Sequence, residues 1–510
     1  MEMIRETPAK DSLKHYIITF SVMLATVMQA LDSTIANVAL PHIQGSLSAT
    51  QDQMTWVLTS YIVASAIMIP LTGWLAGYIG RKLVFLVSIA GFIISSVLCG
   101  IAESLPEMIF FRLLQGISGA ALVPLSQAVL FSINTKENYA KAMALWGVGV
   151  TMGPILGPVL GGWLTDNYNW RWVFYINVPI GLLALTGLYF FLEETEPRKS
   201  PFDFLGFFTL SVSVGALQIM LDRGELLDWF GSIEIIIEAI IAATGFYLFV
   251  VHTFTFQHPF VTPQLFKDRN FTISTVLIFV VGITLFATLA LLPMMLQNQL
   301  NYPVSTAGIV TAPRGAGTML AMLIVGRILN RIDPRYIIIA GLLIVAFSLW
   351  QMTQFSLITE SGPIISAGFI QGFGIGLAYI AISTIAFSTV SSTLHNEGTS
   401  FFNLMRNLGS SIGISVVETM LIRNTQVVHA SLTEHIIPYN VTANPAYIVN
   451  HIHLSDPRSI VLLNAMINNQ AMMVAYIDDY YLIMLITLSV VPLVFLLRKA
   501  KKIDTTVSME

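Results

Sequence analysis

The chain has 510 residues, of which 55% are hydrophobic and 11% are charged, with a formal net charge of −4 and a single cysteine. Because a soluble domain carries about 25% charged residues, this composition excludes an ordinary soluble protein and indicates that most of the chain faces lipid. The sequence also excludes a nucleic-acid-binding protein, which needs a basic tract, and an internal disulfide, since Cys99 has no second cysteine as a partner.

Apolar segments long enough to cross a bilayer recur along the whole chain. A spanning helix needs about 20 apolar residues, and this criterion predicts an all-α integral membrane protein with about fourteen transmembrane helices. They are expected at 15–38, 54–76, 83–102, 107–131, 142–164, 173–192, 204–222, 232–254, 271–296, 304–329, 336–355, 362–390, 399–422 and 480–497. The first segment is longer than the apolar part of a secretory signal, so we expect it to remain as a spanning helix.

The positions of the positively charged residues predict the orientation of these helices. If both termini are cytoplasmic, most of the 25 Lys and Arg residues lie on the cytoplasmic side, as the positive-inside rule requires. The opposite side then holds only Arg171, Arg223, Arg423 and Arg458. We therefore expect a multi-pass protein with both termini in the cytoplasm.

Two similar turns indicate that the chain consists of two related halves. Residues 73–82 (GWLAGYIGRK) follow the second predicted helix, and residues 326–335 (GRILNRIDPR) follow the tenth. Weak internal symmetry is typical of transporters built from two repeats. Since the second turn follows the tenth helix and not the eighth, two helices are expected between the halves. The predicted parts are an N-tail (1–14), a six-helix half (15–192), a cytoplasmic linker (193–203), two inserted helices (204–254), a six-helix half (271–497) with an outer loop (425–479), and a C-tail (498–510).

Asp32 is the strongest candidate for chemistry inside the membrane, because an ionisable residue there is costly and is a functional candidate by default. With 100° per residue, the polar residues of its segment share one arc of about 140°: Gln29, Asp32, Ser33 and Asn37. This polar side faces either a water-filled cavity or another helix. Asp32 is then either a packing residue or a carboxylate that binds a proton or a cation. The proton hypothesis requires that Asp32 is reached in turn from both sides of the membrane.

Arg112 is expected at a similar depth in the fourth predicted helix. Asp32 lies about eight residues and Arg112 about six residues from the outer ends of their helices, which corresponds to roughly 9–13 Å. An ion pair forms if these helices are close, and movement of the guanidinium would then change how strongly Asp32 holds a proton. The alternative is a static ion pair or a role in capping backbone groups.

The fifth predicted helix has glycines at intervals of four residues, which form a bare face that admits a neighbouring backbone closely. Its small and helix-bending residues are Gly149, Gly153, Pro154, Gly157, Pro158, Gly161 and Gly162. The two prolines remove backbone donors and are expected to kink the helix. This segment is predicted to be a pivot or a seal against leaks, with dense static packing as the alternative.

The remaining polar residues within predicted helices are weaker candidates. Arg314 either lines a cavity of the second half or is structural, and Glu418, near the outer end of its helix, is more typical of a snorkelling group. The candidate residues of a substrate cavity are Gln29, Ser33, Asn37, Gln115, Arg314 and Glu418. No metal or cofactor site is predicted, since the P-loop and HExxH sequences are absent.

The segments with these candidates resemble the signature motifs of one transporter family. Residues 31–41 (LDSTIANVALP), 112–121 (RLLQGISGAA) and 153–162 (GPILGPVLGG) resemble the motifs of helices one, four and five in the fourteen-helix drug:proton antiporters of the major facilitator superfamily. In that family the helix-four arginine, here Arg112, is assigned to proton transfer. The turn 73–82 resembles the gating loop between helices two and three, except that Gly77 replaces an acidic residue. Its matching residues are Gly73, Gly80, Arg81 and Lys82.

Residues 170–181 (WRWVFYINVPIG) and 217–224 (LQIMLDRG) are similar to segments of the EmrB subgroup. This resemblance implies a proton-coupled multidrug efflux transporter of the bacterial inner membrane, which is no enzyme, needs no cofactor and exports small hydrophobic compounds. It also implies a membrane-fusion adaptor in the periplasm and an outer-membrane channel, with the outer loop as a possible contact. Two alternatives stay open: a dedicated exporter of one metabolite or siderophore, and a non-transporting membrane sensor or scaffold.

Overall fold

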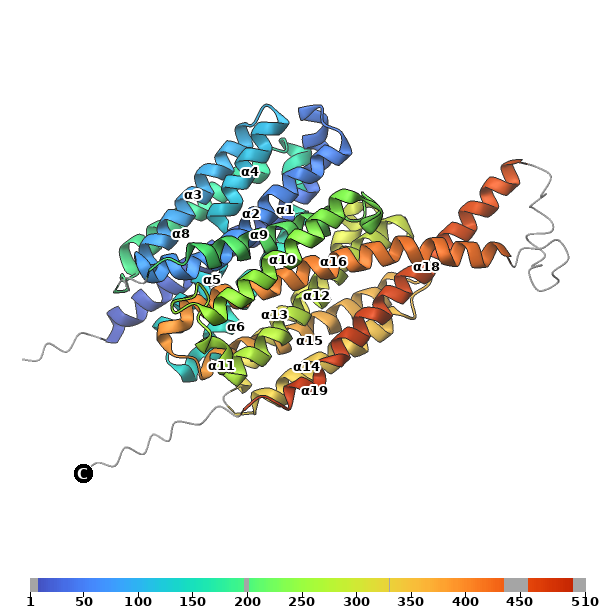
Figure 1. Cartoon of the computed structure of the whole chain (residues 1–510). Coiled ribbons are helices and arrows are strands. Elements are labelled where there is room, and N and C mark those ends of the chain that lie inside the picture. The colour runs from blue at the N-terminus through green and yellow to red at the C-terminus, as the bar shows by residue number, and fades with distance from the viewer. Residues whose placement is uncertain (1–7, 197–200, 330, 435–456, 499–510) are drawn as a thin grey trace, which may run out of the picture.

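The computed structural model describes residues 8–196, 201–329, 331–434 and 457–498, in which every regular element is a helix (Figure 1). The N-terminal half contains α1 (Pro8–Leu47), α2 (Gln51–Tyr78), α3 (Arg81–Ile101), α4 (Leu105–Gly119), α5 (Leu122–Ile133), α6 (Tyr139–Asn167), α7 (Trp172–Tyr175) and α8 (Asn177–Phe191). Between the two halves along the chain lie α9 (Phe204–Arg223) and α10 (Ile233–Thr255), the two helices predicted to be inserted there and called the inserted pair below. The C-terminal half contains α11 (Gln264–Lys267), α12 (Arg269–Asn298), α13 (Val304–Ile328), α14 (Pro334–Met352), α15 (Ser361–Ser388), α16 (His395–Glu434), α18 (Pro457–Ser489) and α19 (Val491–Val494).

The helices lie where the apolar segments predict them. Each of the predicted segments overlaps a described helix, and 12 described helices are long and apolar enough to cross a membrane. The segments 142–164 and 399–422 lie in α6 and α16, which fall outside that group although they have 29 and 40 residues. The all-α membrane fold is therefore confirmed, and the number of fourteen spans stays a prediction.

The outer loop expected at 425–479 is wrong in its extent, because both of its ends are helical. α16 continues to Glu434 and α18 begins at Pro457, while residues 435–456 lie outside the described residues. Neither helical end contains an internal glycine or proline that would stop it. At 1.5 Å per residue, α16 and α18 are about 60 and 50 Å long, well beyond a hydrocarbon core of about 30 Å. They project together from the bundle (Figure 1), with His429 Nε2 and Asn464 Oδ1 2.9 Å apart.

The two halves meet at one end of the bundle, which we call the inner end. It contains the turns at 79–80, 134–138 and 389–394, which the sequence predicts to be cytoplasmic. One apolar cluster there includes residues of both halves, and the rings of Phe131 and Phe387 lie 4.8 Å apart. Toward the opposite, outer end the apolar residues form separate clusters, one within each half.

Polar contacts between the halves are also concentrated toward the inner end. Asn403 Nδ2 of α16 donates to Gln127 Oε1 of α5 over 2.6 Å, and Lys136 Nζ donates to the Ser388 carbonyl over 2.9 Å. The inserted pair bridges the halves toward the outer end, since Asp222 of α9 accepts from α2 and the Leu221 carbonyl accepts from Ser415 of α16. The described conformation is therefore closed at the inner end.

Candidate functional site

Asp32 lies at the centre of a buried hydrogen-bond network that joins α1, α3, α4 and α8. Arg112 Nη1 donates to Asp32 Oδ2, while Gln115 Nε2 and Asn177 Nδ2 both donate to Asp32 Oδ1, each over 2.8 Å. Ser96 Oγ accepts from Asn177 over 2.9 Å and from Gln115 over 3.3 Å. Asp32, Gln115 and Asn177 are 0% exposed and Arg112 is 1% exposed. The structure thus brings Asp32 and Arg112 into direct contact.

Two residues of α4 provide two of the three donors to Asp32. Arg112 and Gln115 are three residues apart, so they lie on the same face of the helix, and Arg112 Nη1 also donates to Gln115 Oε1 over 2.7 Å. Arg112 Nε donates to the Val57 carbonyl over 3.2 Å, and its guanidinium carbon lies 4.4 Å from the centre of the Tyr61 ring. These contacts hold the guanidinium in a fixed position beside the carboxylate.

The donors around Asp32 match its ionised form. A carboxylate is an acceptor only, whereas a protonated carboxyl group also donates. Two donors reach Oδ1 and one reaches Oδ2, so three of the roughly four acceptor sites of the carboxylate are occupied. These three hydrogen bonds tie the Asp32 carboxylate of α1 to α4 and α8.

Asp32 has no access to solvent in this conformation, so the requirement for access from both sides is not met here. On the same polar side of α1, Ser33 is exposed and Gln29 is half-buried, and the side chain of Asn37 lies outside the described residues. Gln29 Nε2 donates to the Tyr61 hydroxyl over 3.2 Å. Since the Tyr61 ring lies against Arg112, the Gln29–Tyr61 contact stands between the partly exposed surface and the buried network.

The glycine face of α6 packs directly on α1. A Cβ added to Gly153 would lie 2.5 Å from the carbonyl carbon of Ala30, one on Gly157 would overlap Thr34, and one on Gly149 would meet Val27 at 3.4 Å. Gly162 has nothing within 4 Å. The Gly161 carbonyl accepts a hydrogen bond from Thr165 over 2.6 Å. The helix continues from Tyr139 to Asn167 through Pro154 and Pro158, whose side chains lie outside the described residues.

The predicted gating loop lies at the inner end. A Cβ on Gly73 would lie 2.9 Å from Glu397 Cα, whereas Gly77 has nothing within 4 Å. Gly80 has φ +102°, which favours glycine, and the carboxylate of Glu194 accepts from the backbone N–H groups of residues 82 and 83 over 3.0 and 3.1 Å.

The two basic residues of this loop have different surroundings. Arg81 Nη1 donates to the Ala128 carbonyl over 3.1 Å. Lys82 Nζ lies 5.7 Å from the centre of the Tyr189 ring. The linker thus contributes an acidic residue, Glu194, to a loop in which Gly77 replaces the usual one.

Arg314 and Glu418 do not join the Asp32 network. Arg314 Nη2 donates to the Leu285 carbonyl over 2.9 Å and to Thr288 Oγ1 over 2.7 Å, so this arginine connects α13 to α12 and is only 7% exposed. Glu418 is half-buried on the outer part of α16. A role of either residue in a cavity stays a prediction.

Asn177 and Ser96 belong to the network, although neither is a predicted site residue. Each is a polar, uncharged residue in an otherwise apolar predicted helix, which is common and has little cost when hydrogen-bonded. The signal for Asn177 was its place in the segment 170–181, which resembles the EmrB subgroup. Its contact with Asp32 depends on how α8 packs on α1.

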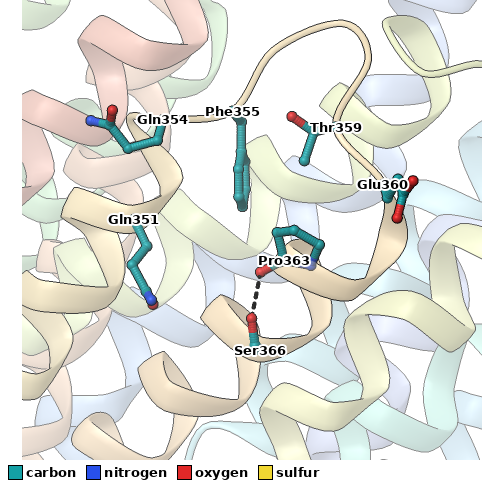
Figure 2. A pocket seen from close by; sticks show the side chains of 7 residues that line it. All are labelled: Gln351, Gln354, Phe355, Thr359, Glu360, Pro363 and Ser366. Atoms are coloured by element: carbon teal, nitrogen blue, oxygen red, sulfur yellow. Dashed lines mark hydrogen bonds between the residues drawn. The ribbon is translucent and has the colours of Figure 1, made fainter.

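A pocket of about 390 Å³ lies elsewhere, at the outer turn between α14 and α15 (Figure 2). Its lining residues are Gln351, Gln354, Phe355, Thr359, Glu360, Pro363 and Ser366. None of them is a predicted site residue, so this pocket is separate from the Asp32 network.

Comparison with known proteins identifies the family. The pattern of the Major Facilitator Superfamily matches residues 22–414. The chain belongs to this family. This major facilitator protein is 40% identical to the multidrug export protein EmrB of Escherichia coli (strain K12) over 434 residues, which cover 84% of this chain and 85% of that protein. It is 37% identical to the fatty acid resistance protein FarB of Neisseria gonorrhoeae over 482 residues, which cover 94% and 95%. The expected EmrB-type subgroup is thus confirmed.

Solved structures agree on the fold of this major facilitator protein. The proton:xylose symporter XylE aligns with a TM-score of 0.61 and 13% identity over 94% of this chain and 97% of that chain. The human organic anion transporter MFSD10 aligns with a TM-score of 0.58 and 14% identity over 94% and 100%. At this identity the likeness shows the fold alone.

Proposed function

We propose that this protein is a proton-coupled multidrug exporter that works by alternating access. The observation that carries the proposal is the fully buried Asp32, which is paired with Arg112 of α4 and also accepts from Gln115 of α4 and Asn177 of α8. Intramembrane charges of this kind mark ion or proton pathways. The named exporters among its relatives support the transport class, and they give no support to a sensor or to a dedicated metabolite exporter.

We infer that the described conformation faces outward with Asp32 ionised. The halves touch at the inner end and have separate apolar clusters toward the outer end. A proton arriving from outside would reach Asp32 when the Gln29–Tyr61 contact opens. It would then displace a donor, release Arg112 from its counter-ion and favour the inward-facing arrangement. Substrate would bind from the cytoplasm as the proton leaves.

The proton gradient provides enough free energy for this exchange. A proton that enters across about 100 mV releases about 2.3 kcal/mol, and one pH unit adds about 1.4 kcal/mol. Together these roughly 3.7 kcal/mol sustain a gradient of several hundredfold for a neutral substrate per proton.

We also propose that the projecting ends of α16 and α18 contact a periplasmic adaptor, which links the transporter to an outer-membrane channel. Both helices extend beyond a bilayer, and they expose large apolar side chains such as Val427, Val461 and Leu462. This placement assumes the orientation that the positive-inside rule predicts, with both termini in the cytoplasm of a bacterium and the helices in its inner membrane.

The decisive experiment is transport by purified protein in proteoliposomes under an imposed pH gradient. Two probes share a naphthalene ring, one with a carboxylate and one with a trimethylammonium group. Wild type should accumulate at least one probe against its gradient, and Asp32→Asn should not. Asp228→Asn is the matched control, since Asp228 lies in the α9–α10 connection with φ +56°, a conformation that asparagine accepts. Gradient-driven accumulation by Asp32→Asn at the wild-type level would overturn the proton assignment.

A further inference from the structure

Arg406 of α16 is a third arginine inside the bundle, in addition to Arg112 and Arg314, and it lacks the acidic partner that Arg112 has. Its Nη1 donates to the Tyr379 hydroxyl over 3.1 Å and its Nη2 to Asn407 Oδ1 over 3.4 Å. Its Nε is buried without an acceptor among the described residues. No ion pair with an acidic side chain forms at Arg406 within the described part of the chain. An intramembrane arginine normally pairs or faces a water-filled space.

Arg406 lies directly outward of the contact that closes the inner end. Asn403, one turn closer to the inner end, bonds to Gln127 of the other half. Tyr379, which accepts from Arg406, stacks on Trp146 of the other half with ring centres 6.2 Å apart. Arg406 is therefore at the interface of the halves, on the side that is open to the outer end in an outward-facing state.

The neighbours of Arg406 on α16 are polar and partly exposed. With 100° per residue, Asn403, Arg406, Asn407 and Ser410 fall within an arc of about 100°. Since Asn403 points to the N-terminal half, the others lie on the side of α16 that faces that half. Arg406, Asn407 and Ser410 are half-buried, whereas Asn403 is 1% exposed. Along α16, the surface that faces the N-terminal half thus changes at Arg406 from a buried contact to a partly exposed polar surface.

Among the described residues, no acidic side chain inside the bundle lies within ion-pair distance of Arg406. Asp32 and Arg112 neutralise each other, and Arg314 donates to neutral oxygens. A guanidinium with free donor capacity binds a carboxylate or phenolate through charge-assisted hydrogen bonds, and an aromatic ring accepts an apolar body.

We propose that Arg406 binds the anionic group of amphipathic organic anions at the interface of the halves, beside Tyr379. This inference rests on the proposed function, because it names a substrate class for the same transporter. A ligand held there would lie between the halves and on the outer side of the closed contact, where an exporter releases its substrate.

Equilibrium binding of the two naphthalene probes to purified protein tests this proposal without a proton gradient. Arg406→Gln should weaken binding of the naphthalene carboxylate about tenfold or more, as expected for the loss of a charge-assisted hydrogen bond, and should leave binding of the trimethylammonium analogue unchanged or tighter. Arg327→Gln is the matched control, because Arg327 is exposed at the inner end of α13 and donates to the Leu323 carbonyl of its own helix. This control should bind both probes as wild type does.

Equal losses for both probes, or no loss for the carboxylate, would overturn the proposal. If Arg406→Gln cannot be purified, Arg406→Lys replaces it. This variant keeps the charge but loses the planar fork, so it should bind the carboxylate a few fold more weakly and the cation as before. Wild-type protein that binds the carboxylate but does not move it under a pH gradient would count against the proposed function alone.

Discussion

Arg112 Nη1 and Asp32 Oδ2 lie 2.8 Å apart, in a position where the side chains are 1% and 0% exposed. Each charge is tolerated in the interior because the other is present. The pair connects α4 to α1, so we propose that protonation of Asp32 and the packing of these helices depend on each other. This dependence is the physical basis of the coupling that we propose.

Removal of one member of this pair should cost more stability than removal of both. Asp32→Asn leaves the Arg112 guanidinium buried without a counter-ion, and we expect it to reduce the free energy of unfolding by about 3–5 kcal/mol. The double variant Asp32→Asn/Arg112→Gln should recover part of that loss while proton-driven export stays absent. Thermal unfolding of the purified proteins measures both effects. A double variant less stable than either single variant would contradict this explanation.

Thiol labelling should distinguish the outer from the inner part of one face of α1, because Thr26 and Ser33 are seven residues apart and share that face. Ser33 is exposed, whereas Thr26 is 0% exposed. In a Cys99→Ala background, Ser33→Cys should react with a membrane-impermeant maleimide added from the outside, and Thr26→Cys should not. Labelling of Ser33→Cys only from the cytoplasmic side would show that the outward-facing assignment is wrong.

The sequence predicted the charged part of the site better than its polar part. The sequence predicts Asp32 and Arg112 because ionisable residues inside apolar segments are rare. Their distances from the outer ends of their helices also place them at similar depths. Asn177 could not be ranked, since its role depends on a tertiary contact with a residue 145 positions away. The count of apolar residues predicts that the last helix begins at residue 480, whereas α18 begins at Pro457, because the criterion measures lipid contact and not helix formation.

Asn177 should matter for coupling as well as for packing. Its amide donates to Asp32 Oδ1 over 2.8 Å and to Ser96 Oγ over 2.9 Å. A hydrogen bond to a charged group contributes about 1.5–3 kcal/mol, so Asn177→Ala should lower the rate of proton-driven export at least about tenfold. Asn167→Ala, which removes a bond to the Trp163 carbonyl at the exposed end of α6, should leave the rate unchanged. Equal rates of proton-driven export for the two variants would show that Asn177 has no role in coupling.

Two glycines of α6 should respond to alanine with opposite signs. A Cβ on Gly153 meets the carbonyl carbon of Ala30 at 2.5 Å, and one on Gly162 meets nothing within 4 Å. Gly153→Ala should destabilise the protein by about 1–3 kcal/mol through overpacking and slow export. Gly162→Ala should stabilise it by up to about 1 kcal/mol, because alanine is the better helix former. The melting temperatures of the two variants decide this, and a shift of the same sign in both would refute the close-contact interpretation.

Asp479 of α18 is expected to lower the stability of the native protein. Its side chain is 0% exposed, and neither carboxylate oxygen has a hydrogen-bond partner among the described residues. A buried polar group without partners costs about 1–3 kcal/mol, so Asp479→Leu should raise the melting temperature. The adjacent Asp478 is exposed, and Asp478→Leu should change the free energy of unfolding by no more than about 0.5 kcal/mol.

A lower melting temperature for Asp479→Leu would mean that this carboxyl group is satisfied in the native protein. A higher melting temperature combined with slower export would have a different meaning. Stabilising changes often reduce activity where function needs a strained or polar site. In that case Asp479 would reduce stability but be needed for transport. It lies in the C-terminal half, whereas Asp32 lies in the N-terminal half.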